Sequence, residues 1–434
     1  MFNIIRNKNG EKRLIENKKV TKKLKEKNKN IINQAVILCG GMGKRLGKKT
    51  KLTPKPLLKI KKKPFLDYLI DHLIRYKITK IVMLCGYKSE QFINKYHKKK
   101  INGVCEIKCI KEKKLMGTGG ALINAKNELD EIFYLVNGDT FFNGDLLYLN
   151  ENFDRSKFDV ILATKKILND RYGSLSLKKK RVSKFLNEPS KKKTYINLGT
   201  YIVKKKLFNN YKKKFFSFEK NLLPTIAKKK KIQFLKFENN FFIDIGIKKD
   251  LKKAINILPN LKYPAVFFDR DGVINLDLGY VHKKKDFYFT KNIFKTIKYF
   301  NRKNYLVFIS SNQSGIGRGY YLEKQVNKLH TWMNQRLEEN FCHVDEIFYA
   351  PYFKLKKKYS TKFHFNLRKP NTGMFDLAKK RWPLDLKKLI VVGDKKVDIE
   401  FGRNIKAKTI MVDENFDMFK QIVSKIQKKK YIIK

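Results

Sequence analysis

The sequence predicts an α/β protein of two domains, because short apolar segments alternate with amphipathic segments in two separate stretches of the chain. The first stretch begins at Gln34 and the second near Ala265; the two carry different motifs and show no internal repeat. A chain of 434 residues is long enough for each domain to bury its own core. We therefore expect a basic, flexible extension over residues 1–30, a first domain over 31–258 and a second domain over 259–434.

The elements of the first domain follow from the spacing of its apolar residues. Residues 1–30 are rich in lysine and asparagine, so they are expected to be flexible or loosely helical. Apolar residues at helical spacing predict a helix over 65–76, and short apolar runs predict strands at 35–39, 80–85, 133–136 and 160–164. Because strands that alternate with helices form a mostly parallel sheet covered by helices, a Rossmann-like domain is expected.

The second domain is predicted by the same argument. A helix and a linker are expected over 251–263, before Pro264. The alternation then restarts, with strands predicted at 265–268, 306–310, 346–349, 389–392 and 409–412.

The composition is that of an ordinary globular protein, with 42% hydrophobic residues. No apolar stretch approaches the ~20 residues that span a bilayer, and residues 1–30 lack the apolar core of a signal peptide. The five cysteines lie mostly in apolar, strand-like segments, which fits reduced thiols. We expect a cytoplasmic protein without membrane insertion, and the oligomeric state stays open.

The net charge of +61 invites a nucleic-acid interpretation, but its distribution argues against one. Short lysine runs recur mostly between apolar segments, and no recognisable nucleic-acid motif accompanies them. The residues of A/T-rich codons are all abundant, so we interpret the charge as compositional drift on solvated loops. Some of it could help to attract phosphorylated substrates, and no nucleic-acid partner is expected.

The first predicted strand runs into a glycine-rich, basic loop that contains Gly40, Gly41, Gly43 and Arg45. Glycines let the backbone approach phosphates, while free amides and a guanidinium neutralise phosphate charge. A glycine turn without a ligand is the simpler interpretation, but the following Pro54-Lys55-Pro56 would be a poor packing motif. A dinucleotide fingerprint is weaker, because Leu46 stands at its third glycine, and a Walker loop fails for lack of Gly-Lys-Ser/Thr.

These positions and several later motifs resemble the sugar-1-phosphate nucleotidylyltransferase family over roughly residues 33–257. The resemblance implies catalytic roles for Arg45 and Lys55, with Lys55 also contacting substrate. It implies nucleotide contacts in a second glycine loop at Gly117, Thr118 and Gly119, Mg²⁺ ligands at Asp139 and Asp244, and sugar contacts at Glu188, Asn197 and Gly199. A sugar phosphate would attack the α-phosphorus of an NTP directly. Segments 64–69, 85–88 and 116–120 look most like the heptose-1-phosphate guanylyltransferase branch, which favours GTP.

In the second domain an apolar strand delivers Asp269 and Asp271 at its carboxyl end. Buried carboxylates are costly unless they bind a metal or do chemistry. Two helix-capping aspartates would be the simpler interpretation, but other polar groups also follow predicted strands, where α/β sheets place ligands. These groups are Ser311, Asn312, Arg368, Lys369, Asp394 and Asp398.

This series is similar to the haloacid dehalogenase-like (HAD-like) phosphatases over about residues 264–420, and segments 269–275, 279–281 and 312–319 look like the heptose-1,7-bisphosphate phosphatase branch. The resemblance implies a Rossmannoid domain with a minimal cap. Asp269 would form an aspartyl-phosphate, and Asp271 would be the general acid and base. Ser311 and Lys369 would bind the phosphoryl group. Asp269, Asp394 and the backbone carbonyl of Asp271 would bind Mg²⁺, and the implied substrate contacts are Asn312, Arg318 and Arg368.

The sequence departs from that branch at a loop that relatives often staple with zinc. The ligand positions hold Ala350, Tyr352, Phe365 and Leu367, so no zinc is expected and packing must order the loop. His343 and His364 remain, but histidines without a fixed partner are more often surface residues than ligands.

Together the motifs predict a bifunctional enzyme of activated-heptose synthesis. The second domain would remove the C7 phosphate of a heptose 1,7-bisphosphate, and the first would join the 1-phosphate to a nucleotide. Two other interpretations stay open: the same reactions on a hexose or N-acetylated sugar phosphate, and a basic binding protein on inactive enzyme folds. The intact catalytic positions count against the latter. The domains are expected to fold and act independently, without a shared tunnel.

Overall fold

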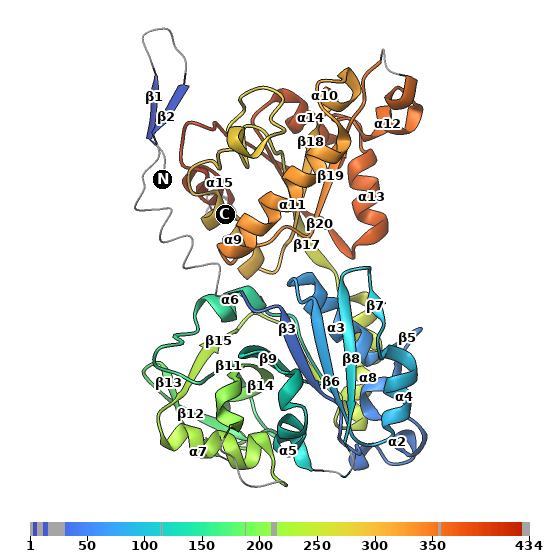
Figure 1. Ribbon diagram of the computed structural model, residues 1–434, viewed down its shortest axis with the longest axis vertical. Coiled ribbons are helices and arrows are strands. Elements are labelled where there is room, and N and C mark those ends of the chain that lie inside the picture. Colours follow the sequence, from blue (N-terminus) through green and yellow to red (C-terminus); the bar gives the residue numbers. More distant parts are fainter. Residues whose placement is uncertain are drawn as a thin grey trace, which may run out of the picture.

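The computed structural model describes residues 3–6, 12–15, 31–112, 114, 116–186, 188–209, 215–354 and 357–427. Within these residues two α/β domains are stacked along the long axis of the molecule (Figure 1). The chain leaves the first domain through α8 (Lys248–Ile257) and η7 (Leu258–Asn260), and it enters the second at β17 (Tyr263–Phe268). The predicted fold class of two α/β domains is thereby confirmed. The mostly parallel sheet predicted for the first domain is wrong, however, because residues 174–204 add antiparallel strands to that sheet.

The first domain is built on a ten-stranded mixed sheet, in which β9, β3, β6 and β8 run parallel. In spatial order its strands are β11 (Val160–Leu168), β15 (Ile232–Lys236), β13 (Arg181–Leu186), β12 (Ser174–Lys178), β14 (Lys193–Lys204), β9 (Ile132–Asn137), β3 (Gln34–Leu38), β6 (Lys80–Cys85), β8 (Cys105–Lys111) and β7 (Lys100–Ile101). The α-helices before α8 are α2 (Lys48–Leu52), α3 (Phe65–Arg75), α4 (Ser89–Tyr96), α5 (Gly117–Asn124), α6 (Leu146–Glu151) and α7 (Leu223–Lys228).

Short strand pairs complete this domain. β4 (Lys59–Ile60) pairs with β5 (Lys63–Pro64), and β10 (Thr140–Phe142) pairs with β16 (Phe242–Asp244). Near the N-terminus β1 (Asn3–Arg6) and β2 (Lys12–Ile15) form an antiparallel pair, whereas a flexible or loosely helical extension was predicted there. The rest of residues 1–30 lies outside the described residues.

The second domain has a five-stranded, all-parallel sheet. Its order is β19 (Glu346–Ala350), β18 (Leu306–Asn312), β17, β20 (Leu384–Gly393) and β21 (Lys408–Met411). The helices are α9 (Ile293–Arg302), α10 (Ser314–Arg318), α11 (Glu323–Glu339), α12 (Lys362–Leu367), α13 (Gly373–Arg381), α14 (Lys396–Asn404) and α15 (Met418–Gln427).

The central strands are apolar on both faces because both faces are covered. In β17, Val266 and Phe268 belong to one hydrophobic cluster, while Ala265 and Phe267 belong to another. Alternate side chains of a strand point to opposite faces, so a continuous apolar run buries both. None of the helices among the described residues is long and apolar enough to cross a membrane.

Candidate active sites

Asp269, the predicted nucleophile, follows β17 and is buried, with 8% of its surface exposed. The Nζ atom of Lys369 lies 2.9 Å from Asp269 Oδ1 and 2.5 Å from Asp398 Oδ1. Burial raises the pKa of Asp269 to about 7, against the pull of Lys369. Burial opposes the charge on Lys369, yet the two carboxylates raise its pKa above the usual value. Lys369 is therefore a fixed cation beside the nucleophile, well placed to bind a phosphoryl group.

Asp271 has a different environment, although it stands only two residues away. Arg270 Nη2 lies 2.8 Å from Asp271 Oδ2, and Gln313 Nε2 donates to the same oxygen at 2.9 Å. Asn275 Nδ2 donates to the other oxygen at 2.9 Å. Arg270 is fully buried, and its Nη1 atom lies 3.2 Å from His330 Nε2. Burial lowers the pKa of His330 to about 3. These contacts orient Asp271, which remains 17% exposed, as an acid-base group requires.

The end of β18 brings Ser311 and Asn312 into the same site. Gln313 Nε2 donates to Ser311 Oγ at 2.8 Å. The side chain of Asn312 makes two hydrogen bonds with the backbone of Lys369. Lys369 N donates to Asn312 Oδ1 at 2.9 Å, and Asn312 Nδ2 donates to Lys369 O at 3.2 Å. The amide of Asn312 thus positions Lys369, and its contact with substrate stays a prediction.

The carboxylates of this site fit a divalent cation. Ligand oxygens of Asp269, Asp394 and Asp398 lie within 4.8 Å of one another. Asp394 Oδ1 is buried without a hydrogen-bond partner among the described residues, and burial raises the pKa of Asp394 to about 6. Gly272 has a φ of 87°, and a Cβ there would lie 2.3 Å from Asp394 Oδ2, so the backbone after Asp271 closes onto this carboxylate. Such oxygens are the ligands that Mg²⁺ prefers.

The predicted substrate contacts Arg318 and Arg368 bring positive charge and aromatic surface to the same site. Burial and the nearby Arg318 lower the pKa of Arg368, which directly precedes Lys369. The guanidinium of Arg318 lies 4.3 Å from the ring centroid of Phe353. The exposed rings of Tyr280 and Tyr320 meet edge to face, with centroids 4.8 Å apart. Two guanidinium groups that influence each other's charge in this way could both bind a second anionic group of the substrate.

Side-chain packing occupies the loop positions where zinc ligands stand in relatives. The rings of Tyr352 and Phe365 meet edge to face, with centroids 5.2 Å apart. Ala350 and Leu367 are buried in the hydrophobic cluster that also contains Phe267. The expectation that packing orders this loop is therefore met at these four positions.

In the first domain the predicted glycine loop follows β3. Gly43 has a φ of 64°, and a Cβ there would lie 3.0 Å from Thr50 Cγ2. A Cβ at Gly40 would lie 2.7 Å from Glu112 Oε1, whereas one at Gly41 would meet no described atom within 4 Å. Arg45 is exposed in the short helix η2 (Lys44–Leu46). The positive φ favours glycine at position 43, whereas a Cβ at Gly40 would displace only the end of the Glu112 side chain; Gly41 and Arg45 leave room for an approaching phosphate.

The pairing of β10 with β16 brings the two predicted Mg²⁺ aspartates together. Thr140 stands opposite Asp244, and Ile245 N donates to the backbone oxygen of Asp139 at 3.0 Å. Burial and the nearby Asp139 raise the pKa of Asp244. Each aspartate is paired with a cation, since Lys55 Nζ contacts Asp139 Oδ2 and Arg171 Nη2 lies 2.7 Å from Asp244 Oδ1. This donor set of adjacent carboxylates also fits Mg²⁺.

The second glycine loop begins α5 and packs against the segment around Phe216. Gly119 N donates to Phe216 O at 3.0 Å, and Phe218 N donates to Thr118 Oγ1 at 2.9 Å. A Cβ at Gly117 would lie 2.6 Å from Phe216 O. These close contacts explain the glycines, so the nucleotide role of Gly117, Thr118 and Gly119 stays a prediction.

The predicted sugar-binding residues lie around β14. Gly199 has a φ of 66°, and its N–H donates to Asn197 Oδ1 at 3.0 Å. Asn197 Nδ2 contacts the hydroxyl of Tyr201, which donates to Glu219 Oε1 at 2.5 Å. Asn197 therefore belongs to a polar network that can fix its amide for a sugar hydroxyl. Glu188 is exposed in the turn between β13 and β14, and its sugar contact stays a prediction.

A cavity of about 670 Å³ opens beside Asp244. Its lining includes the cations Arg45, Lys165, Arg171, Lys249 and Lys253. The sequence interpretation missed Arg171, which contacts Asp250 as well as Asp244, and it missed Arg270 and Gln313 of the second domain. Only Arg270 had a sequence signal, as a cation between two aspartates at the end of an apolar strand; the others depend on contacts between distant segments.

Known proteins resemble the two domains separately. The pattern of the nucleotidyl transferase family matches residues 34–260, and that of the HAD-hydrolase-like family matches residues 366–434. A D-glycero-alpha-D-manno-heptose 1-phosphate guanylyltransferase of Campylobacter jejuni is 37% identical over 222 residues, which cover 50% of this chain and 96% of that protein. A D-glycero-alpha-D-manno-heptose-1,7-bisphosphate 7-phosphatase of the same organism is 39% identical over 165 residues, which cover 37% of this chain and 91% of that protein.

A solved structure is also similar to part of the chain. The crystal structure of HddC from Yersinia pseudotuberculosis is 31% identical and covers 52% of this chain and 99% of its own, with a TM-score of 0.47. The family matches and the two Campylobacter relatives confirm both resemblances noted in the sequence. The chain therefore belongs to the nucleotidyl transferase family through its first domain and to the HAD-like hydrolases through its second.

Proposed function

We propose that this chain is a bifunctional enzyme of nucleotide-activated heptose synthesis. Its second domain removes the C7 phosphate of a heptose 1,7-bisphosphate, and its first domain transfers a nucleotidyl group from GTP to the heptose 1-phosphate. The observation that carries the proposal is the pair Asp269 and Asp271, of which one faces a buried lysine and the other is oriented by Arg270. The names of the relatives, each of which matches one domain, supply the sugar and the base.

In the phosphatase step, Asp269 attacks the phosphorus of the C7 phosphate and forms an aspartyl-phosphate as the bond to the sugar oxygen breaks. Asp271 donates its proton to the leaving oxygen and then accepts one from the water that attacks the aspartyl-phosphate. Inorganic phosphate leaves and Asp269 is regenerated. Lys369 neutralises the transferring phosphoryl group, and Arg318 with Arg368 would hold the C1 phosphate.

In the transferase step, an oxygen of the sugar phosphate attacks the α-phosphorus of the NTP, and pyrophosphate leaves. The amides of the glycine loop and Arg45 bind the phosphates, while Lys55 holds the attacking group. We propose Mg²⁺ as the cofactor of both sites, held by Asp139 and Asp244 in the first domain and by Asp269 and Asp394 in the second. Bound there, the ion would neutralise charge that develops on phosphate oxygens.

The test uses the purified chain with Mg²⁺, both anomers of heptose 1,7-bisphosphate and a panel of NTPs. Without NTP we expect inorganic phosphate and heptose 1-phosphate; with GTP we expect pyrophosphate and a GDP-heptose, which mass spectrometry identifies. Faster turnover of hexose or N-acetylated sugar phosphates would assign another sugar. No release of phosphate from any sugar phosphate would overturn the phosphatase assignment, and no release of pyrophosphate from any NTP with heptose 1-phosphate would overturn the transferase assignment. We also propose that the protein works in the cytoplasm, where these soluble substrates occur.

A further inference from the structure

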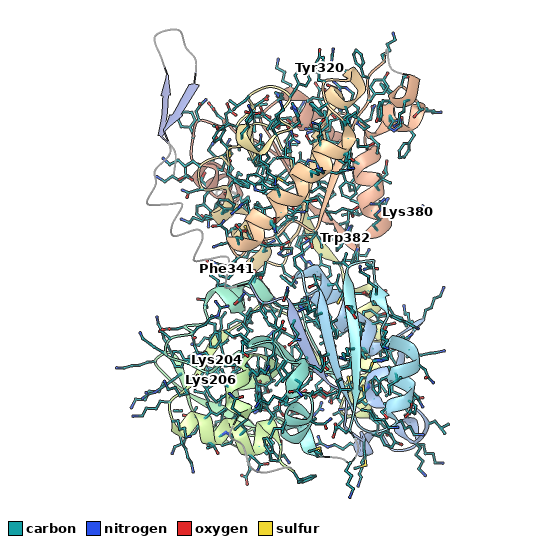
Figure 2. The ribbon with its side chains drawn as sticks, viewed as in Figure 1. Lys204, Lys206, Tyr320, Phe341, Lys380 and Trp382 are labelled. Carbon is teal, nitrogen blue, oxygen red and sulfur yellow. The ribbon has the colours of Figure 1, made fainter. Side chains whose placement is uncertain are left out.

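The two domains meet at the amino ends of their parallel strands. In the first domain, α3 ends at Arg75, shortly before β6 begins; in the second, Tyr305 and Asp345 directly precede β18 and β19. The catalytic residues of both domains instead follow the carboxyl ends of strands. Figure 2 shows Phe341 where the domains meet and Tyr320, near the phosphatase site, at the far end of the second domain. The contact is thus separate from both active sites.

A buried ion pair lies at the centre of this contact. Arg75 Nε donates to Asp345 Oδ1 at 2.7 Å, and the two side chains are 7% and 0% exposed. Arg75 Nη2 also donates to the backbone oxygen of Tyr305 at 2.8 Å. Burial alone would raise the pKa of Asp345, but Arg75 and His343 hold it well below its usual range. Both charges are therefore desolvated and satisfied across the domain boundary.

A second charged contact joins α6 to α9. Glu151 Oε1 lies 2.5 Å from Lys298 Nζ, and Glu151 Oε2 lies 2.6 Å from Arg302 Nη2. The guanidinium of Arg302 also lies 4.3 Å from the ring centroid of Tyr148. Glu151 and Tyr148 belong to the first domain and their partners to the second, so this contact extends the interface away from the central pair.

Apolar and aromatic groups also take part in the contact between the domains. Phe341 of the second domain is 9% exposed and packs in the hydrophobic core of the first. The rings of Tyr76 and His343 meet edge to face across the boundary, with centroids 4.8 Å apart. Contacts between domains that move freely are solvated and polar, whereas this one includes a dry ion pair and a shared core.

We propose that the two domains form a specific non-covalent complex whose stability does not depend on the linker. Each domain is the protein partner of the other, with Arg75–Asp345 at the centre and Glu151 at the edge. Separation of the domains would expose Phe341 and the packed rings of Tyr76 and His343 to water, so the burial of these groups favours the complex. The ion pair adds specificity, because a surface without its partner would leave a buried charge uncompensated. The inference predicts that a chain cut between its domains remains one particle.

The test cuts the intact protein after it has folded. A site for a specific protease is inserted between Leu261 and Lys262, in the segment that joins η7 to β17. After cleavage we expect both fragments to elute together from a gel-filtration column, at the volume of the uncut chain. Arg75→Glu places a second negative charge against Asp345, and we expect it to weaken association of the fragments by about 100-fold. Glu151→Lys repels Lys298 and Arg302, and we expect a loss of about tenfold.

Lys108→Glu is the matched control, because it reverses a charge in the exposed intradomain pair with Glu128 and should leave association unchanged. Circular dichroism of each uncut variant checks that the domains are folded. Folded fragments that separate after cleavage of the unmutated chain would overturn the proposal, and so would fragments that unfold. Co-elution that neither Arg75→Glu nor Glu151→Lys weakens would show that another surface holds the fragments together.

Discussion

Asp269 and Asp271 are chemically identical, and their neighbours separate their roles. The ammonium of Lys369 lies 2.9 Å from Asp269 Oδ1, where a cation can stabilise the charge of a transferring phosphoryl group. Asp271 instead is fixed by hydrogen bonds from Arg270, Asn275 and Gln313. In the proposed reaction this fixed carboxyl group exchanges protons with the leaving oxygen and with water.

Replacing Asp269 with Asn should therefore abolish phosphatase turnover, by at least roughly 10³-fold, because an amide is a far weaker nucleophile than a carboxylate. Nucleotidyl transfer to added heptose 1-phosphate should remain near the rate of the unmutated chain. Phosphate and pyrophosphate release from one preparation measure both activities. If a folded variant lost both, the assignment of two independent sites would be wrong.

Asp139→Ala should have the opposite effect. The variant loses a carboxylate of the proposed Mg²⁺ site and leaves Lys55 without its partner, so we expect transfer to fall by roughly 100-fold or more. Phosphate release by the second domain should be unchanged. Asp71→Ala, at an exposed aspartate of the same domain, serves as the control. Near-normal pyrophosphate release by Asp139→Ala would show that the metal site is elsewhere.

At the scale of elements, an apolar run predicts a strand most directly where the strand is buried on both faces of the sheet, although the partly exposed edge strands β19 and β21 were predicted as well. In β17, for example, the apolar run Ala265–Phe268 alone predicts a strand, without information on the strands that pair with it. The start of β20 at Leu384 was missed because three of residues 385–388 are charged and interrupt the apolar run, and it is visible only through pairing with Tyr263. The aspartates at strand ends were also predictable from the sequence. Burying a carboxylate costs free energy, so a carboxylate that follows a buried strand indicates a metal site or a catalytic role.

Contacts between segments far apart in the chain were not predictable. Arg171 reaches Asp244 only because the segment between β11 and β12 contacts β16 in the folded domain, and no local pattern marks it. Gln313 likewise follows β18 as an ordinary polar residue, although it donates to both Asp271 and Ser311. The ion pair of Arg75 with Asp345 depends on how two separate sheets meet.

The loop between β19 and α13 leads to a prediction about metal content. Tyr352 and Phe365 pack against each other where relatives carry zinc ligands, and neither side chain binds zinc well. Elemental analysis should find no stoichiometric zinc, and a zinc chelator used with excess Mg²⁺ should not change phosphatase activity. One tightly held zinc per chain would contradict this prediction.

At the scale of the whole molecule, the ion pair between the domains should make stability depend on pH. A carboxyl whose pKa is lowered by folding stabilises the protein above its unfolded pKa of about 3.9, and this stabilisation is lost as the pH falls towards the folded value. Asp345 is such a group. Asp345→Asn should lower the urea midpoint at pH 7, by the equivalent of about 3 kcal/mol.

The difference in midpoint between the unmutated chain and Asp345→Asn should then narrow as the pH falls below about 4, because the native carboxyl also becomes protonated. Asp376→Asn, at an exposed aspartate of α13, should change the midpoint little at any pH. A difference that stays constant from pH 7 to pH 2 would show that the charge of Asp345 does not contribute.

The arrangement of the domains also decides how the intermediate travels. Both active sites lie at the carboxyl ends of their sheets and the domains join at the amino ends, so each site is about one strand length, ~17–20 Å, from the contact. Because the domains join at the amino ends of both sheets, we expect heptose 1-phosphate to leave the second domain and reach the first through solvent.

An equimolar mixture of two full-length variants, Asp269→Asn and Asp139→Ala, tests this path, because no single chain in the mixture carries both active sites. The mixture is compared with the unmutated chain at a concentration that gives the same number of intact phosphatase sites and of intact transferase sites. With heptose 1,7-bisphosphate and GTP, we expect both samples to form nucleotide sugar at the same rate. Unlabelled heptose 1-phosphate added to a labelled bisphosphate should also dilute the label in the product of the unmutated chain. Each variant alone should form almost no product from the bisphosphate. The mixture could instead form product many-fold more slowly, although each variant keeps its remaining activity. That result would mean that the intermediate passes directly between the domains of one chain, and it would contradict the predicted path through solvent.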